Sequence, residues 1–208
     1  MINVYCVLVK PLYDIKYVER LYLSVRQNLT LPFNMICLTD SEWKTDLPIT
    51  FINVRKYDLD IWWNKVAMLS SELSGPGSNL YFDLDVSIID NIDFLLDDLT
   101  TEHLCVVDSV WKDEGYKNPK QFGKFGSAFY CYGNSSVLGW IGNSQHYLFD
   151  KLMNDIMITV EHYGDDTYLN KYANTKFFQQ KICDYLSPES MYSMKDKRVL
   201  IHFKDPPT

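Results

Sequence analysis

Short apolar runs alternate with stretches of helical periodicity along the first half of the chain. Four runs are bounded by polar or turn-forming residues and are typical of buried strands: residues 2–9, 33–38, 49–54 and 79–83. Between them, apolar residues recur at helical spacing from Val18 to Val25, after a potential N-cap at Asp14, and residues 61–73 are also predicted to be a helix. Strands that alternate with helices predict an α/β fold with a mostly parallel sheet.

The pattern is less regular in the second half. Short strands are predicted at residues 104–108, 128–132 and 198–203, and mainly helical structure at residues 145–156 and 166–185. A polar and aromatic segment, residues 111–125, separates the first two of these strands. Long loops are often functional, so we expect an acceptor-binding loop here, with a plain surface excursion as the alternative. No internal repeat or linker is found, which favours one domain over residues 1–208.

The composition is that of an acidic globular protein. Of the 208 residues, 47% are apolar, and the formal net charge is −7. This balance disfavours nucleic acid and anionic membrane surfaces as partners, because both attract basic patches. The chain shows no signal-peptide pattern and no apolar run that could serve as a transmembrane segment, so we expect a soluble, cytoplasmic protein. Its five cysteines have no zinc-site spacing and indicate a reducing compartment.

Four side chains follow directly after predicted strands: Tyr13, Asp40, Asp83 and Asp85. In parallel α/β sheets, ligands bind beyond the carboxyl ends of the strands. We therefore expect these side chains to gather at one edge of the sheet and to line a binding site there.

The Asp83-Leu84-Asp85 segment is the centre of the predicted chemistry. In an extended segment, residues i and i+2 point the same way, so the two carboxylates repel each other unless a cation joins them. A hard divalent ion does this and holds a diphosphate at the same time. A solvated strand end is the alternative, but the apolar residues 80–82 favour burial, and buried acids need a counter-charge.

Other polar residues each have a structural and a functional interpretation. His202, in the last predicted strand, is either a hydrogen-bonded histidine or a nitrogen ligand of the kind that favours manganese. Lys65 either packs its stem or reaches a phosphate. Asp165 and Asp166, after Gly164, either stabilise a helix start or accept hydrogen bonds from sugar hydroxyls.

Four segments occur in an order that resembles a known group of proteins: Tyr17–Tyr22, Asn34–Asp40, Trp62–Lys65 and Tyr81–Val86. Together they resemble bacterial and viral glycosyltransferase-like proteins of the GT-A fold, which are similar to the glycogenin and lipopolysaccharide galactosyltransferase family. The resemblance implies a mixed, mostly parallel sheet flanked by helices. It also implies a nucleotide-binding half, residues 1–86, and an acceptor-side half, residues 87–208.

The resemblance implies a metal site. In that family the two aspartates of the DxD motif and a late histidine bind manganese. Here this implies Asp83, Asp85 and His202 as ligands of Mn²⁺ or Mg²⁺.

The resemblance also implies a donor site and catalytic residues. The family's first loop holds the nucleotide base, and a basic residue on the helix before the DxD strand contacts the donor. The predicted donor-binding residues are Lys10, Tyr13, Asp40, Lys65, Asp83 and Lys204. A Gly-Asp-Gln segment of the family touches the transferred sugar, and its counterpart here has Asp166 in place of glutamine. Asp165, Asp166 and Lys65 are the predicted catalytic residues.

The predicted function is metal-dependent transfer of a sugar from a nucleotide-sugar donor, a UDP-sugar, to a saccharide or other hydroxyl acceptor, with retention. One alternative is a haloacid-dehalogenase-type phosphatase, although Val86-Ser87 follows the motif where that family has Gly-Thr. The other is a nucleotide-sugar- or carbohydrate-binding module with a decayed active site, because Asp166 and the shortened tail, Lys204-Asp205-Pro206-Pro207, depart from the family. The resemblance also makes Gly126-Ser127-Ala128 the counterpart of the family's Asn-Ser-Gly segment on an inner strand.

Overall fold

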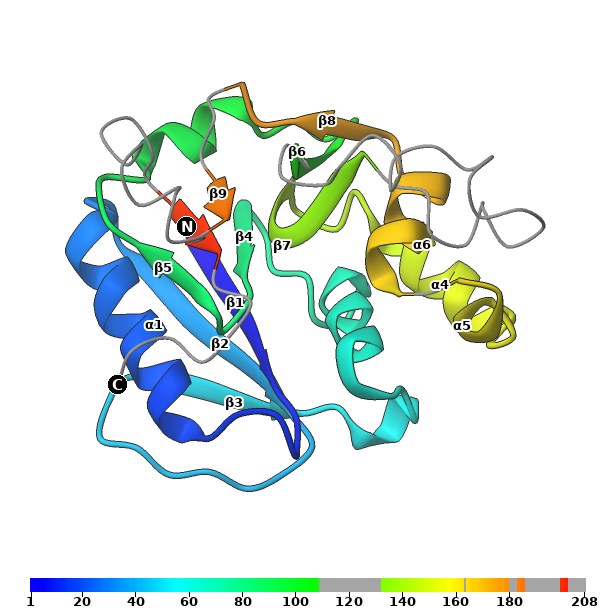
Figure 1. Cartoon of the computed structure of the whole chain (residues 1–208), viewed down its shortest axis with the longest axis horizontal. Helices are drawn as coiled ribbons and strands as arrows, with labels where there is room; N and C mark the ends of the chain where they lie inside the picture. The colour runs from blue at the N-terminus through cyan, green and yellow to red at the C-terminus, as the bar shows by residue number, and fades with distance from the viewer. Residues whose placement is uncertain (109–131, 163, 180–182, 186–198, 202–208) are drawn as a thin grey trace.

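A mixed sheet runs through the middle of the molecule (Figure 1). The computed structural model describes residues 1–108, 132–162, 164–179, 183–185 and 199–201. Within these residues, seven strands form one sheet in the order β3-β2-β1-β4-β7-β6-β8. The strands are β1 (Ile2–Leu8), β2 (Phe33–Thr39), β3 (Ile49–Asn53), β4 (Ser78–Phe82), β6 (Leu104–Asp108), β7 (Gly133–Ile141) and β8 (Thr175–Phe177). Only β7 runs antiparallel to its described neighbours, β4 and β6, so the predicted mostly parallel sheet is confirmed.

A second sheet packs against one face of the first. Among the described residues it has the order β5-β10-β9, with bounds Val86–Ile88, Val199–Ile201 and Cys183–Tyr185. The Asp83-Leu84-Asp85 segment was expected to be extended, but Leu84 and Asp85 form a turn, with the backbone N–H of Val86 donating to the carbonyl of Asp83, and β5 begins directly after it. The strand β10 confirms the last strand predicted from the sequence, of which residues 198, 202 and 203 lie outside the described residues.

Helices cover both faces of the large sheet (Figure 1). The helix α1 (Ile15–Asn28) lies on the same face as β5, and the 3₁₀ helix η2 (Ile61–Leu69) lies on the other with α4 (His146–Asn154), α5 (Ile158–Glu161) and α6 (Asp165–Tyr172). Short 3₁₀ turns, η1 (Arg55–Tyr57) and η3 (Asp93–Asp98), complete the described helical elements. Within β1, Val4 and Cys6 pack into the core beneath α1, while Tyr5 packs into the core beneath η2, as alternation along a strand requires.

The helix α1 forms as its sequence predicts. The Asp14 carboxylate accepts a hydrogen bond from the backbone N–H of Lys16 and so caps the first turn. The expected apolar positions from Val18 to Val25 are buried against the sheet.

The helix predicted at residues 61–73 has a different geometry and ends earlier. Residues Ile61–Leu69 form a 3₁₀ helix, and every residue from Trp63 to Leu69 is buried. Runs of 3₁₀ helix this long are uncommon and often mark functional or strained segments. The helix begins at Ile61, whose φ of 37° is unusual for a β-branched residue.

In the second half, one predicted helix is too long and one strand was not predicted. The helix predicted at residues 166–185 ends at Tyr172, because the following residues form β8 and pair in parallel with β6. The strand β7, at Gly133–Ile141, was not predicted, because it opens with residues that are typical of turns. Residues 128–131 of the strand predicted at 128–132, and the predicted loop at 111–125, lie outside the described residues. In the described part of the chain, no helix combines the length and apolar character that crossing a membrane requires.

Candidate active site

A pocket of about 150 Å³ opens at the carboxyl ends of β1 and β4. It is lined by residues that follow or end these strands and by the start of η2: Val7, Val9, Leu12, Tyr13, Ile61, Trp62, Lys65, Tyr81 and Asp83. Since β1, β2 and β4 are parallel, their carboxyl ends meet at this edge, as the sequence predicted. A larger pocket of about 600 Å³, beside the amino end of β2, contains none of the predicted site residues.

A buried ammonium group joins the two halves of the chain at this edge. Lys65 Nζ lies 3.1 Å from Asp83 Oδ1 and 3.0 Å from Asp165 Oδ2. It also donates to the hydroxyl of Ser135 at 2.8 Å. Burial alone lowers the pKa of Lys65, but the charges of Asp165, Asp83 and Asp166 outweigh it and raise the pKa. The lysine therefore stays charged, and its role is that of a fixed cation.

Ser135, on β7, connects Lys65 with both acids of α6. Its hydroxyl donates to Asp165 Oδ2 at 2.5 Å, and its backbone N–H donates to Asp166 Oδ1 at 2.7 Å. The side chain of Asn134 also donates to Asp166, at 3.4 Å. These bonds hold the acids at the start of α6 towards the end of the DxD strand, where Asp165 is 6% exposed.

Asp83 is held from three sides. Its backbone N–H donates to the carbonyl of Ser136 at 2.9 Å, and the Tyr81 hydroxyl donates to its carboxylate. Burial, together with the charge of Asp83, keeps the pKa of Tyr81 well above its usual value, so the phenol remains a donor. With Lys65 on the same carboxylate, Asp83 has a fixed orientation.

The carboxylate of Asp85, unlike that of Asp83, is only partly hydrogen-bonded. Its Oδ1 is buried and has no hydrogen-bond partner. Burial, with the nearby charge of Asp83, raises the pKa of Asp85 to about 7 against the opposing effect of Lys65 and Arg20. Arg20, on α1, donates to the carbonyl of Leu84 at 2.5 Å and so braces the turn between the two aspartates. A buried carboxylate oxygen without a donor requires an explanation, and a cation bound at Asp85 would provide one.

The residues predicted for the base-binding loop lie at the same edge. The backbone N–H of Lys10 donates to both carboxylate oxygens of Asp40 at 3.4 Å, which joins the ends of β1 and β2. The Lys10 ammonium lies 5.5 Å from the ring centre of Trp43. Tyr13 lines the pocket and packs against Tyr17 with 4.8 Å between ring centres.

The structure thus brings Lys65, Asp83, Asp165 and Asp166 into one network and leaves Asp85 beside it. His202 and Lys204 lie outside the described residues. Within the described ranges, no group of three or more His, Cys, Asp or Glu side chains is arranged to hold a metal ion. Any metal bound there would have Asp83 and Asp85 as its described protein ligands.

Sequence reasoning missed Ser135, Tyr81 and Arg20. The segment Gly126-Ser127-Ala128 was chosen as the counterpart of an Asn-Ser-Gly segment on an inner strand, and it lies outside the described residues. The structure describes a different Asn-Ser segment, Asn134-Ser135, on the strand that pairs with β4. The Asn134-Ser135 dipeptide was the feature of the sequence that could have identified this segment.

The same arrangement of elements occurs in solved enzymes. The chain superimposes on the galactosyltransferase LgtC, solved in complex with donor and acceptor sugar analogues, with a TM-score of 0.61 and 16% identity, over 97% of this chain and 87% of that one. An active-site mutant of LgtC matches with the same TM-score and identity, over 98% and 88% of the two chains. This chain has the GT-A fold. No protein-family model matches it, and the comparison with curated proteins found no match.

The fold assignment agrees with the position of the Lys65 network at the carboxyl ends of the parallel strands. In parallel α/β sheets, ligands bind beyond the carboxyl ends of the strands, and the network of Lys65 and the aspartates lies there. At 16% identity, the match establishes the fold, and the chemistry has to be argued from this chain's own residues.

Proposed function

We propose that this chain is a metal-dependent glycosyltransferase that takes a sugar from a UDP-sugar and transfers it to a hydroxyl acceptor. One observation carries the proposal. Two carboxylates, Asp83 and Asp165, contact the buried ammonium of Lys65 at the ligand-binding edge of a GT-A fold, and the carboxylates of Asp166 and Asp85 lie near it, with Arg20 beside Asp85 as a second cation. This surplus of negative charge favours a cation and neutral hydroxyl groups as ligands.

The residues present fit a divalent ion. The unpartnered Oδ1 of Asp85 and the neighbouring carboxylate of Asp83 are hard oxygen ligands of the type that Mn²⁺ and Mg²⁺ bind. A bound ion would supply positive charge against the leaving diphosphate. His202 remains a predicted third ligand from the sequence resemblance.

Each residue of the network is proposed to have a distinct task. Lys65 is held in place by Asp165 and Ser135, and we assign it to the donor's phosphate side, where it orients Asp83. Asp165 and Asp166 are assigned to the transferred sugar, because carboxylate oxygens accept hydrogen bonds from its hydroxyls. Lys10, Tyr13 and Asp40 are assigned to the nucleoside, and Lys204 to a phosphate.

The proposed reaction breaks the bond between the anomeric carbon and the diphosphate oxygen and forms one to the acceptor oxygen. The acceptor's proton passes to a phosphate oxygen. Retention of the anomeric configuration is proposed from the sequence resemblance, and proton NMR of the product tests it. We further propose that residues 1–86 bind the nucleotide and residues 87–208, including the predicted loop at 111–125, meet the acceptor.

The decisive experiment is a donor screen with UDP- and GDP-sugars, each with Mn²⁺, with Mg²⁺ and with EDTA. We expect metal-dependent release of UDP and a rise in melting temperature that needs both metal and nucleotide, because each completes the other's site. Stabilisation without release of UDP would support the binding-module alternative. Hydrolysis of p-nitrophenyl phosphate, with no response to any nucleoside diphosphate, would support the phosphatase alternative and contradict the proposal.

A further inference from the structure

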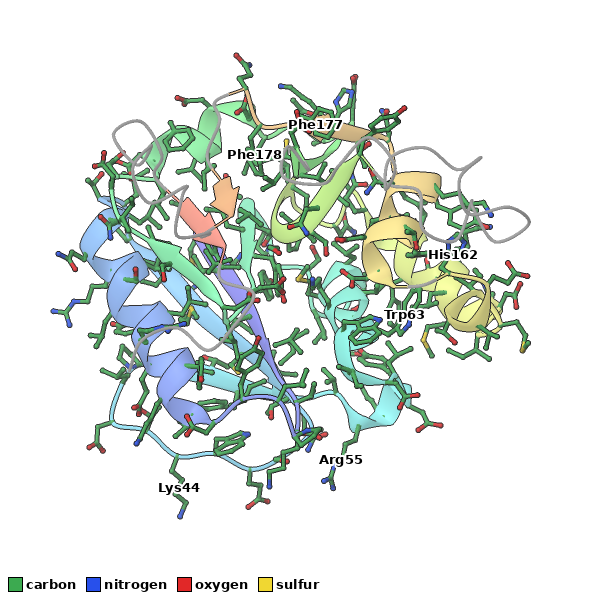
Figure 2. The ribbon with its side chains drawn as sticks, in the orientation of Figure 1. Lys44, Arg55, Trp63, His162, Phe177 and Phe178 are labelled. Atoms are coloured by element: carbon green, nitrogen blue, oxygen red, sulfur yellow. The ribbon has the colours of Figure 1, made fainter. Side chains whose placement is uncertain are left out.

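Two consecutive tryptophans at the start of η2 have opposite environments. Trp63, which is labelled in Figure 2, is 4% exposed. Its ring packs against Tyr168 of α6, with 5.7 Å between ring centres. Trp62 is 45% exposed, although tryptophan is the residue with the largest apolar area to bury. Among the described residues, the core accounts for Trp63 and leaves nearly half of the Trp62 surface exposed.

The backbone before Trp62 is strained. Ile61 has a φ of 37°, a conformation that β-branched residues rarely adopt, and it starts the long 3₁₀ helix. Such strain persists where the surrounding structure or a function maintains it. In a 3₁₀ helix the side chains at i and i+3 share a face, so Trp62 and Lys65 line the same pocket, while Lys65 also reaches the buried network.

The indole ring lies between the pocket and the acids of α6. Trp62 lines the same pocket as Lys65 and Asp83. Its Nε1 lies 3.4 Å, and its Cδ1 3.7 Å, from the position that a Cβ would take on Gly164. A Cβ on Gly164 would make only ordinary van der Waals contact with the ring, so the indole lies beside the residue that leads into Asp165 and Asp166.

An exposed indole ring next to carboxylates matches the two faces of a sugar. A pyranose presents a face of C–H groups, which packs on an aromatic ring, and a rim of hydroxyls, which donate to carboxylates. We propose that Trp62 is the wall of a pyranose subsite and stacks on the sugar ring whose hydroxyls meet the acids of α6. This inference rests on the proposed function and deepens it, since it names a specificity-determining residue for the sugar.

The sugar can come from the donor or from the acceptor, and the two sources give different results. The variants are Trp62→Ala and Trp62→Phe, with Leu23→Ala as a control. Leu23 is 51% exposed on α1, on the other face of the sheet, so its loss reports only the effect of trimming an exposed apolar side chain. Calorimetric titrations with Mn²⁺ compare UDP with UDP-glucose, UDP-galactose, UDP-N-acetylglucosamine and UDP-N-acetylgalactosamine.

If the donor's sugar stacks on Trp62, Trp62→Ala weakens the binding of at least one UDP-sugar by about three- to tenfold and leaves UDP unchanged. Trp62→Phe restores part of that affinity, because a smaller ring still stacks. If the acceptor's sugar stacks there, the loss appears instead with methyl glucosides or methyl galactosides, titrated in the presence of Mn²⁺ and UDP. Leu23→Ala changes none of these affinities.

Two outcomes overturn the inference. Equal weakening of UDP and UDP-sugars would make Trp62 a nucleoside contact, and unchanged affinity for every UDP-sugar and methyl glycoside would make it a plain surface residue. Neither result touches the proposed function. If instead the wild type binds no nucleotide at all, the proposed function fails, and tryptophan fluorescence titrated with the methyl glycosides decides the sugar subsite separately: a change that Trp62→Phe abolishes supports it, and no change refutes it.

Discussion

Lys65 and Asp165 form a buried ion pair, with 3.0 Å between Nζ and Oδ2, although they belong to different halves of the chain. The side chains are 6% and 9% exposed. A pair of this kind is stable only because further polar groups satisfy it, here the Ser135 hydroxyl and the Asp83 carboxylate. The pair therefore joins η2 to α6, and the contact of Lys65 with Asp83 extends this connection to the end of β4, so the site's geometry is part of the fold.

Removing the ammonium should destabilise the protein strongly. Lys65→Met leaves Asp83 and Asp165 buried without their cation, and loss of one partner of a buried pair costs about 3–5 kcal/mol. Urea unfolding followed by circular dichroism measures the loss. The control is Lys56→Met, which breaks the exposed Lys56–Glu72 pair and should have little effect. If the two variants unfold at similar urea concentrations, the Lys65 network contributes little to the fold.

Asp85→Asn should have the opposite effect on the metal-free protein. The folded pKa of Asp85 is about 7, above its unfolded value of about 3.9, so its ionisation costs stability increasingly as the pH rises from 4 to 7. The variant should therefore melt at a higher temperature than the metal-free wild type at pH 7.5. Asp83→Asn is the contrasting variant, and it should melt lower, because Asp83 belongs to the Lys65 ion pair.

Bound metal should reverse the order of the melting temperatures of the wild type and Asp85→Asn. At a ligand concentration of 100 times Kd, Mn²⁺ with UDP should stabilise the wild type by about 2.7 kcal/mol. Asp85→Asn should lose most of this gain, since its buried oxygen no longer carries charge. Differential scanning calorimetry with and without EDTA measures both effects. An undiminished manganese response in Asp85→Asn would remove Asp85 from the metal site.

The sequence predicted the first four strands of the large sheet because each is a short apolar run that ends in a polar residue. It therefore predicted that Asp40 and Asp83 lie at one edge, and β1, β2 and β4 are indeed parallel. The strands β1 and β4 are buried on both faces, so each appears in the sequence as a continuous apolar run.

The second half was harder to predict because its structure depends on pairing. The segment Thr175–Phe177 becomes β8 by pairing with β6, and nothing in its own pattern separates it from the preceding helix. The role of Ser135 was not predicted for a similar reason. Its hydroxyl can bond Lys65 only because the pairing of β7 with β4 brings the two residues together. Local pattern carries no information about such distant neighbours.

Ser135→Ala should loosen the two acids of α6. Its hydroxyl bonds both Asp165 and Lys65, and a buried charged group left short of a hydrogen bond costs about 1–3 kcal/mol. Urea unfolding measures the change. Ser136→Ala, one position along β7, removes a hydroxyl of the same size and should cost less. Equal losses in the two variants would show that the Ser135 hydroxyl has no special role.

His162 should make the protein sensitive to mild acid. It is 4% exposed, and neither ring nitrogen has a hydrogen-bond partner. Its ring lies edge-on to Tyr168 and Tyr172, at 6.1 and 5.6 Å between centres, and it is labelled in Figure 2 beside α6. Burial, with the nearby charge of Lys171, lowers the pKa of His162, and Glu161 opposes this only in part.

The sign of the effect follows from the direction of that shift. Below about pH 6.5 the unfolded chain binds a proton at this histidine that the folded protein does not bind, so stability falls as the pH falls through this range. The melting temperature should therefore fall between pH 7.5 and pH 5.5 through this residue. His162→Phe keeps an aromatic ring in the same apolar surroundings and should lose that part of the pH dependence.

A second histidine provides the control for this comparison. His146 is exposed at the start of α4, with 3.9 Å between its Nε2 and Asp150 Oδ2, so its replacement leaves the buried surroundings of His162 unchanged. His146→Gln should therefore keep the wild-type pH dependence. Because every variant shares the same carboxylates, the difference between the two melting curves isolates His162. If His162→Phe loses stability towards pH 5.5 as steeply as His146→Gln, the buried histidine does not control the acid response, and the aspartates of the Lys65 network become the groups to examine.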